Sequence, residues 1–415
     1  MDFIIQASQF LLSLSLLIVL HEFGHFIPAK LFKTRVEKFY LFFDPYFSIF
    51  KKKIGGTEYG IGWPQPWEFR SKPAWQRLII MVGGVTVNVI LAIFIYTGMM
   101  MYYGEDYLPI KGIEHGLMMD DNGKAIGLED GDLVIAVDGK PIERYTEIPK
   151  EILLSENEIT VLRAGLEIKL PVLDEHKKLL LDNQTPIVGL RFPYIVGAFT
   201  DSSVAESAGL AVGDSVVSFN GREMRFYDMY LDSIPAYAGK PITFGVYREG
   251  AYLDISMTVP EEGKIGVYPG GPSPATYYPV ETKRYGFFAA FPAGLTKAKT
   301  VLQDYIRQFR LIFNPETEAY KQVGGFIAIG SQFDTSWNWE RFWSFTAFLS
   351  IMLAFLNILP IPALDGGHVV FVLWEMITGR KPSDKVLEYA QVAGFVILLS
   401  LIVLANGNDI LRLFQ

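Results

Sequence analysis

Four long apolar runs constrain the fold of this chain more than any other feature of its sequence. They are separated by polar segments and cover residues 3–31, 75–103, 342–364 and 387–404. A hydrocarbon core of about 30 Å is crossed by roughly 20 helical residues, and each run is long enough for this. Charged residues make up 20% of the chain, below the roughly 25% of soluble domains. We therefore expect four transmembrane helices.

The first run does not have the features of a cleaved signal peptide. Such a peptide has a basic start, a short apolar stretch and a cleavage site with small residues. This chain instead has an acidic residue, Asp2, near its start, its first run is longer, and His21, Glu22 and His25 lie within it. The run is therefore expected to remain as a membrane span.

Charge along the chain predicts an orientation. Residues 33–77 carry nine Lys or Arg and four acids, whereas residues 104–284 carry more acids than bases. Short loops rich in Lys and Arg mark the cytoplasmic side of a membrane. We expect the loop between the first two spans inside, and both termini with the long acidic segment outside. Because the chain has no cysteine, disulfides, thiolate ligands and cysteine nucleophiles are excluded.

A repeat lies within the long polar segment. Gly-Leu-Glu-Asp-Gly-Asp-Leu-Val at 127–134 corresponds to Gly-Leu-Ala-Val-Gly-Asp-Ser-Val at 209–216, and Asp138-Gly139 corresponds to Asn220-Gly221. The same offset of 82 residues relates both pairs of motifs. The repetition predicts two similar β-rich domains in tandem. The pattern resembles the circularly permuted PDZ domains of bacterial proteases, which implies binding of an extended peptide at a sheet edge. A pair of β-rich spacers with closed grooves is the alternative.

Residues 284–313 follow a Pro/Gly linker and predict an amphipathic helix. The apolar positions recur at steps of three and four, and basic residues occupy much of the other face (Lys297, Lys299, Arg307 and Arg310). A helix of this kind lies on the membrane or against the spans. Packing in the core of the soluble domains is the alternative.

The sequence His21-Glu22-Phe23-Gly24-His25 predicts a metal site. Residues four apart share one face of a helix, so both imidazoles can reach one ion, and zinc is the ion such a pair suits. Glu22 lies beside that face, where it can take a proton from a water molecule that the ion activates. The alternative is a helix end with two unremarkable histidines. His21 lies 18 residues into the run, about 27 Å along a helix, and ionisable side chains at such depth are costly unless they are functional.

A third protein ligand must come from elsewhere, because a catalytic zinc ion usually has three. Asp365 follows the third run, which crosses in the same direction as the first, so the predicted topology brings it level with the two histidines. Pro360 and Pro362 cannot continue a regular helix, and an unwound segment is expected there. Asp365 as a helix terminator is the alternative, and ligation by His368 is not expected.

These two motifs together resemble the signatures of the site-2 protease family of intramembrane metalloproteases, in the branch of the bacterial regulators of sigma E. The resemblance covers nearly the whole chain. It implies His21, His25 and Asp365 as Zn²⁺ ligands and Glu22 as catalytic base. It also implies substrate contacts by Asn357, Pro360 and Pro362 and, in a re-entrant β-hairpin loop, by an edge strand with Gly60, Ile61 and Gly62.

Two departures from the family pattern stand out. In the second span the family commonly has Gly-Pro before an Asn, whereas here Val85 follows Gly84. The correspondence of Asn88 to that Asn is therefore supported by only part of the family's motif. The family also has more chain than this sequence between Trp63 and Pro64.

The expected fold class is a multi-span α-helical membrane protein with two tandem β-rich PDZ domains. The expected divisions are 1–103 for the first two spans with the re-entrant loop, 104–190 and 191–270 for the PDZ domains, 271–338 for the linker and amphipathic helix, and 339–415 for the last two spans. The expected function is intramembrane zinc endopeptidase. A membrane-anchored PDZ adaptor leaves the metal motif unexplained, and a metal transporter leaves the soluble domains unexplained.

The expected partners follow from that function. They are membrane lipid and single-span proteins of the anti-sigma factor type already trimmed outside the membrane; no nucleic acid is expected. We further expect a monomer in the bacterial inner membrane, with the PDZ domains in the periplasm and the active site near the cytoplasmic face.

Overall fold

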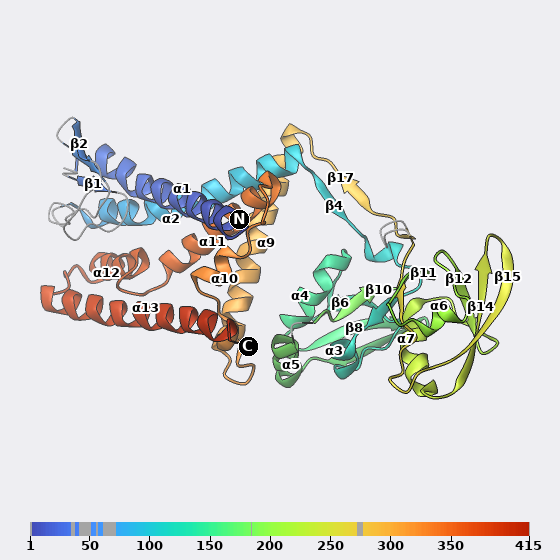
Figure 1. Ribbon diagram of the computed structural model, residues 1–415. Coiled ribbons are helices and arrows are strands. Elements are labelled where there is room, and N and C mark those ends of the chain that lie inside the picture. Colours follow the sequence, from blue (N-terminus) through green and yellow to red (C-terminus); the bar gives the residue numbers. More distant parts are fainter. Residues whose placement is uncertain are drawn as a thin grey trace. The chain divides into compact units, whose positions relative to one another are not determined.

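The computed structural model describes residues 2–34, 38–40, 51–54, 57–60, 72–183, 185–271 and 277–414. The junction of Trp63 and Pro64 lies outside these residues, as do Ile61 and Gly62. The chain forms two compact units, which Figure 1 shows coloured along the sequence. A membrane unit combines Met1–Glu105 with Lys283–Gln415, and a β unit comprises Asp106–Thr282. The predicted segment 271–338 is thus divided between the two units.

Among the described residues, four helices are long and apolar enough to cross a membrane, as expected. They are α1 (Asp2–Leu31), α2 (Ala74–Tyr102), α11 (Trp339–Ile358) and α13 (Asp384–Arg412). The third span ends at Ile358, earlier than the apolar run, because Pro360 and Pro362 interrupt the helix. A further helix, α12 (Asp365–Thr378), follows the unwound residues and was not predicted.

Helix α2 is the centre of the membrane unit and packs against α1, α9, α11 and α12. The backbones of α1 and α2 approach closely at Gly24, since a Cβ atom there would lie 2.7 Å from the Cα atom of Gly84. Small residues permit such contacts between membrane helices. Buried hydroxyl groups join α1 to α11, with Thr346 Oγ1 2.9 Å from Ser13 Oγ. This hydrogen bond pairs one buried hydroxyl group of each helix inside the unit.

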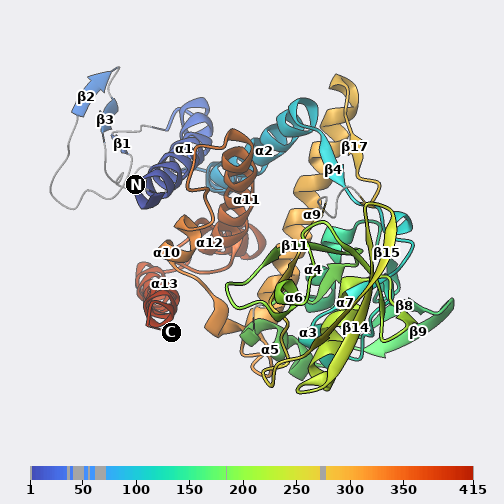
Figure 2. The ribbon, with the colours of Figure 1, turned by 45° about the vertical axis from the view of Figure 1, so that its right-hand side comes forward.

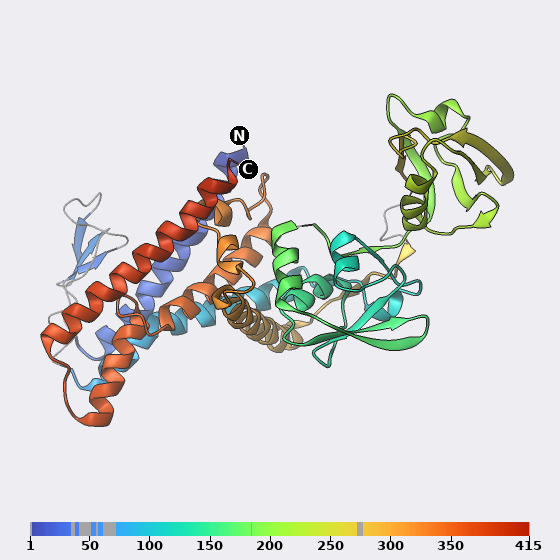
Figure 3. The same cartoon turned by 90° about the horizontal axis from the view of Figure 1, so that it is seen from below.

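Helix α9 (Phe287–Phe313) forms the predicted amphipathic helix and belongs to the membrane unit. Ala298 packs with Ala92 and Tyr96 of α2, and Gly294 lies against Thr97. The helix runs across the spans, since Figure 3 shows it nearly end-on where α13 is seen lengthwise. This agrees with the expectation that the helix packs against the spans.

The C-terminal end of α13 is fixed by a buried carboxylate. Asp409 accepts hydrogen bonds from the backbone N–H groups of Gly325, Ile327 and Ala328 at 2.9–3.1 Å. These residues begin α10 (Phe326–Gly330), which follows the short turn η5 (Ala319–Gln322). Nearer the start of α13, a Cβ atom on Gly394 would lie 2.7 Å from the backbone nitrogen of Ala363. The last span is therefore joined to the unwound segment.

A small sheet lies between α1 and α2 in the sequence (Figure 2). Its strands β1 (Lys38–Tyr40), β3 (Thr57–Gly60) and β2 (Lys51–Ile54) lie in that order. Gly60 pairs with Tyr40 on one side and Lys51 on the other. The strand is therefore paired on both sides at Gly60, and the rest of the predicted edge, Ile61 and Gly62, lies outside the described residues.

The β unit consists of two halves, each with its own apolar core. The first half contains a four-stranded sheet of order β7-β6-β8-β9 and a two-stranded sheet of β10 and β5, and the second has the order β15-β14-β12-β11-β16. The strands of the first half are β5 (Leu117–Met119), β6 (Leu133–Val137), β7 (Lys140–Pro141), β8 (Glu158–Arg163), β9 (Leu166–Pro171) and β10 (Val188–Leu190). Those of the second are β11 (Tyr194–Phe199), β12 (Ser215–Phe219), β13 (Arg222–Glu223), β14 (Pro241–Arg248), β15 (Ala251–Thr258) and β16 (Val267–Pro269). The helices are α3 (Asp121–Ala125), α4 (Ile148–Leu153), α5 (Asp174–Asn183), α6 (Val204–Ser207) and α7 (Tyr227–Ser233), and β4 (Glu105–Tyr107) pairs with β17 (Glu281–Lys283) where the chain passes between the units.

The sequence repeat produces the same ion pair in both halves, in which a buried aspartate meets a partly exposed arginine. Asp132 accepts hydrogen bonds from Arg163 at 2.7 and 2.8 Å, and Asp214 accepts them from Arg248 at 2.6 and 2.7 Å. Each arginine also donates to the backbone carbonyl of the first glycine of its repeat. The repeat therefore encodes a turn that is fixed to the strand opposite it.

Candidate metal centre

Two imidazoles of α1 meet on the face that packs against α2. His21 is buried and His25 is partly buried, and their Nε2 atoms are 3.2 Å apart. The rings meet edge to face with centroids 4.8 Å apart. The spacing of four residues brings them together, as expected from the helical repeat.

Asp365 comes to the same point from the first turn of α12. Its Oδ2 atom lies 3.1 Å from His21 Nε2 and 3.2 Å from His25 Nε2. Gly366 and Gly367 make this approach possible, because a Cβ on either would collide with the backbone of the unwound segment. A Cβ on Gly366 would be 2.5 Å from the Ile358 carbonyl carbon, and one on Gly367 would be 2.5 Å from Ile361 O.

The three donor atoms fit a tetrahedral metal ion. Their mutual separations of 3.1–3.2 Å are close to the roughly 3.4 Å expected between ligands that lie about 2.1 Å from one ion. Asp365 Oδ2 is buried and has no partner of hydrogen-bonding geometry among the described residues. Two nitrogens and a carboxylate oxygen are also a donor set that suits zinc. The residues present therefore fit this ion.

Helix α2 leaves space for the rings and holds their outer nitrogens. A Cβ atom on Gly84 would lie 2.6 Å from His21 Cε1 and closer still to His25 Nε2. Nδ1 of His25 lies 2.7 Å from the carbonyl oxygen of Ile80, and Nδ1 of His21 lies 3.1 Å from the side-chain amide of Asn88. With both Nδ1 atoms engaged, the Nε2 atoms face Asp365. The sequence did not predict the contact with Ile80, because every residue type has a backbone carbonyl and no motif identifies the one that is used.

Glu22 is partly buried and lies within electrostatic reach of His25, His21 and Asp365. It follows His21 directly on α1, so its side chain leaves the helix beside the imidazole pair. It is not one of the three grouped donor atoms. This arrangement leaves its carboxylate available for proton transfer.

Three of the other predicted site residues lie shortly before α12, whereas Gly60 lies on β3. Asn357 is in the last turn of α11 and partly buried, and Pro360 and Pro362 lie in the unwound segment that leads to Asp365. His368 is one turn beyond Asp365 on α12 and outside the donor group. Within the described part of the chain, His21, His25 and Asp365 form the one group able to hold a metal ion.

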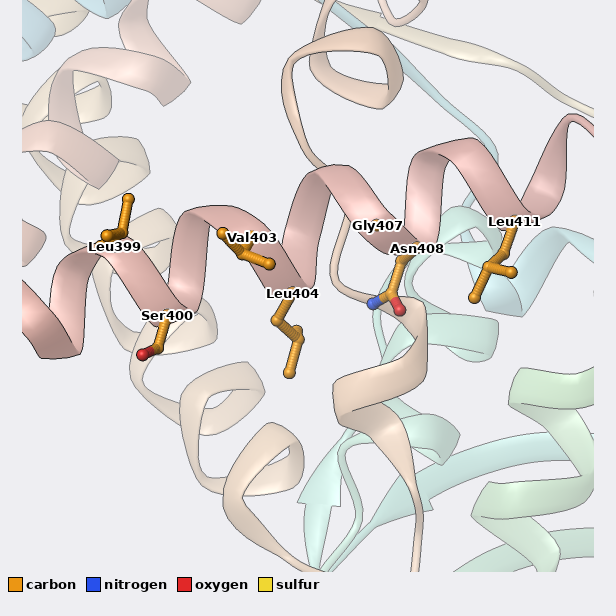
Figure 4. A pocket seen from close by; sticks show the side chains of 7 residues that line it. All are labelled: Leu399, Ser400, Val403, Leu404, Gly407, Asn408 and Leu411. Atoms are coloured by element: carbon orange, nitrogen blue, oxygen red, sulfur yellow. The ribbon is translucent and has the colours of Figure 1, made fainter.

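A hollow of about 530 Å³ on α13 lies away from this chemistry. Figure 4 shows its lining, which contains no titratable side chain and comprises Leu399, Ser400, Val403, Leu404, Gly407, Asn408 and Leu411. The lining is mainly apolar and includes none of the residues of the metal centre.

Spans that enclose two imidazoles, a carboxylate and a neighbouring glutamate define a membrane-embedded metalloprotease. Comparison with known proteins agrees with this class. The model of peptidase family M50 matches residues 9–401, and the chain belongs to this family. It is therefore an integral membrane zinc metalloendopeptidase of the site-2 protease type.

Relatives match over nearly their whole length. A Salmonella typhimurium protein named regulator of sigma-E protease RseP is 25% identical, with 98% of each chain covered. A Haemophilus influenzae regulator of sigma E protease is 24% identical, with 100% of each covered. A Vibrio cholerae protein whose name assigns it to the zinc metalloproteases is 26% identical over 97% of this chain and 98% of its own.

Proposed function

We propose that His21 and His25 bind the zinc ion through Nε2 and that Asp365 binds it through Oδ2. The observation that carries this proposal is the triangle of donor atoms 3.1–3.2 Å apart, with Asp365 Oδ2 buried and lacking a hydrogen-bond donor. Bound zinc supplies Lewis-acid activation of water and of a peptide carbonyl. Glu22 accepts the proton from the attacking water on its carboxylate and returns it to the leaving amine.

The substrate is proposed to be the membrane segment of a single-span protein. Four apolar spans and a site formed by α1 and α12 favour cleavage inside or at the edge of the bilayer. Asn357, Pro360 and Pro362 lie on the segment before Asp365, where the interrupted helix provides backbone groups for an extended substrate. The names of the Salmonella and Haemophilus relatives favour an anti-sigma factor as the class of substrate.

The site is proposed to lie near the cytoplasmic face of a bacterial inner membrane, with the β unit in the periplasm. The nine basic residues between the first two spans support this orientation. His21 lies about 28 Å along α1 from Asp2, which places the imidazoles toward the far end of this span.

The two halves of the β unit are proposed to be PDZ domains. Each contains the repeated turn, a strand pair behind it and a short helix after it, α4 in the first and α7 in the second. In the second half, β16 is the end strand of its sheet, which suits addition of an extended peptide.

Replacing Glu22 tests the mechanism. Glu22→Gln should retain one zinc ion per chain, measured on protein in detergent, and lose cleavage of a single-span substrate in liposomes by about 10²–10⁴-fold. His21→Ala should lose the zinc. Unchanged cleavage by Glu22→Gln would contradict the mechanism, and substrate binding without cleavage by the zinc-loaded wild type would favour the PDZ adaptor instead.

A further inference from the structure

Among the described residues, one face of α2 carries the hydrogen-bonding contacts to the outer nitrogens of the imidazole pair. Ile80, Gly84 and Asn88 recur at steps of four and are all buried. Ile80 offers its backbone carbonyl to His25, Gly84 leaves room for both rings, and Asn88 offers its side chain to His21. Asn88 has no exposed surface. A fully buried amide within a span is costly unless its polar atoms are paired.

The pairing of Asn88 is incomplete in a specific way. Its Nδ2 atom faces His21 Nδ1 at 3.1 Å, and its Oδ1 atom has no hydrogen-bond partner among the described residues. A neutral imidazole that uses Nε2 for an ion carries its proton on Nδ1. Two N–H donors would then face each other. Amide oxygen and nitrogen have nearly the same size, so the reversed amide occupies the same space.

We propose that the Asn88 amide is turned so that Oδ1 accepts the Nδ1–H of His21, which makes Asn88 a positioning residue for the metal centre. This hydrogen bond selects the tautomer with a free Nε2 and fixes the ring toward Asp365. Ile80 does the same for His25 through its carbonyl oxygen, 2.7 Å from Nδ1. An amide acceptor suits a membrane span because, unlike a carboxylate, it adds no charge.

Asn88 is also held through its backbone. Ser350 Oγ on α11 donates to the backbone carbonyl of Asn88 at 2.8 Å. Ser350 therefore contacts the same residue without contacting the imidazole. Its replacement is a matched control for packing, because it removes a buried hydrogen bond of Asn88 and leaves the side-chain amide in place.

Zinc affinity of the purified full chain, measured by competition with a chelator, tests the inference. Asn88→Leu keeps a similar volume without an acceptor and should weaken zinc binding about 10–100-fold, the usual effect of losing an outer partner. Asn88→Asp retains an acceptor and should stay within about threefold of the wild type, as should Ser350→Ala. Equal losses of affinity in Asn88→Leu and Ser350→Ala would overturn the inference in favour of packing.

A second measurement needs no variant. Nitrogen NMR of the zinc-loaded wild type with labelled histidine should show His21 protonated on Nδ1, and protonation on Nε2 would overturn the inference. The inference rests on the proposed function, and His21→Ala separates the two. If His21→Ala loses zinc while Asn88→Leu does not, the inference alone fails. If His21→Ala binds zinc as the wild type does, the proposed ligand set fails with it.

Discussion

Two regions of the membrane unit bury a carboxylate, and they do so in opposite ways. At the end of α13, Asp409 is 4% exposed and accepts three backbone hydrogen bonds from the residues that begin α10. At the start of α12, Asp365 Oδ2 faces two imidazole nitrogens and has no donor of suitable geometry among the described residues. The first carboxylate is satisfied by the chain itself, and we propose that the second is satisfied by the bound metal ion.

The difference separates a structural carboxylate from a functional one. Transferring a charged group from water to the protein interior is costly. The free backbone N–H groups of a helix N-terminus compensate this cost without a second side chain. Asp365 is also in the first turn of a helix, but there the unwound segment before α12 turns its side chain toward α1. The β unit follows the pattern of Asp409, since Asp132 and Asp214 are each paired with an arginine and a backbone N–H.

The largest expected effect is on zinc affinity, and it comes from replacing each of the two carboxylates in turn. Asp365→Asn should weaken zinc binding by more than the roughly 10–100-fold cost of losing an outer partner, because a ligand itself is lost. Asp409→Asn is the matched control and should retain zinc while the end of α13 exchanges its amide hydrogens faster. Zinc content and hydrogen exchange of both variants in detergent measure this. Loss of zinc in both variants to the same degree would erase the distinction between the two carboxylates.

A variant of Gly84 tests whether the metal centre also depends on the space left for the two imidazole rings, since this residue carries no charge. Gly84→Ala places a methyl group among the ring atoms of His21 and His25 and should displace the Nε2 atoms from Asp365. We expect zinc affinity to fall about 10–100-fold, comparable to the loss of an outer partner. Gly98, also on α2, has nothing within 4 Å of its Cβ position, and Gly98→Ala should bind zinc as the wild type does. Equal zinc affinities of the two variants would contradict the proposed role of Gly84.

The sequence predicted the spans and the residues that gather at the metal centre, because apolar length and the spacing of His21 and His25 are local properties. It also placed Asp365 at the right depth through the alternation of spans. It did not predict α12, since two prolines after Ile358 indicate a break but not that a helix resumes at Asp365. The contacts of Gly84 and of the Ile80 carbonyl depend on how α2 packs on α1, and no spacing in either helix contains that information.

The next effect is on the stability of the β unit and comes from its two carboxylates that pair with arginine, Asp132 and Asp214. Asp132→Ala should destabilise the first half by about 1–3 kcal/mol, because Arg163 loses its buried carboxylate partner and retains only the exposed carboxylate of Glu129. Hydrogen exchange of the full chain should show loss of protection in β6 and β8 with β12 and β14 unchanged. Asp214→Ala should give the reverse pattern. Neither variant should change zinc content, and a loss of zinc in either would show that these pairs do more than hold their turns.

The smallest effect concerns a single pair of positions, Asp138 and Asn220, that the repeat aligns. Asn220 Oδ1 accepts a hydrogen bond from Thr243 N at 2.8 Å, and Asp138 accepts bonds from the N–H groups of residues 156–158 and from Ser155. Both residues have positive φ, 50° and 49°, which Asn and Asp tolerate better than most side chains. The two turns are thus alike in backbone and differ in charge.

Partial burial acts against the charge of Asp138, but the hydrogen bonds from the backbone of Glu156 and Glu158, from Ser155 and from Asn157 outweigh it and lower the pKa of this carboxyl below its ordinary value. A group whose pKa is lower in the folded state stabilises that state above its unfolded pKa of about 4 and loses this contribution as the pH falls below it. The stability of the first half should therefore decline between pH 5 and pH 3, by less than about 1 kcal/mol, because most of the Asp138 side chain is exposed to water, which screens its charge. Asp138→Asn should abolish this decline, and Asn220→Asp should introduce one in the second half. Hydrogen exchange of the two halves across this pH range measures these declines in stability. If the first half of Asp138→Asn loses stability as the wild type does, other carboxylates cause the decline.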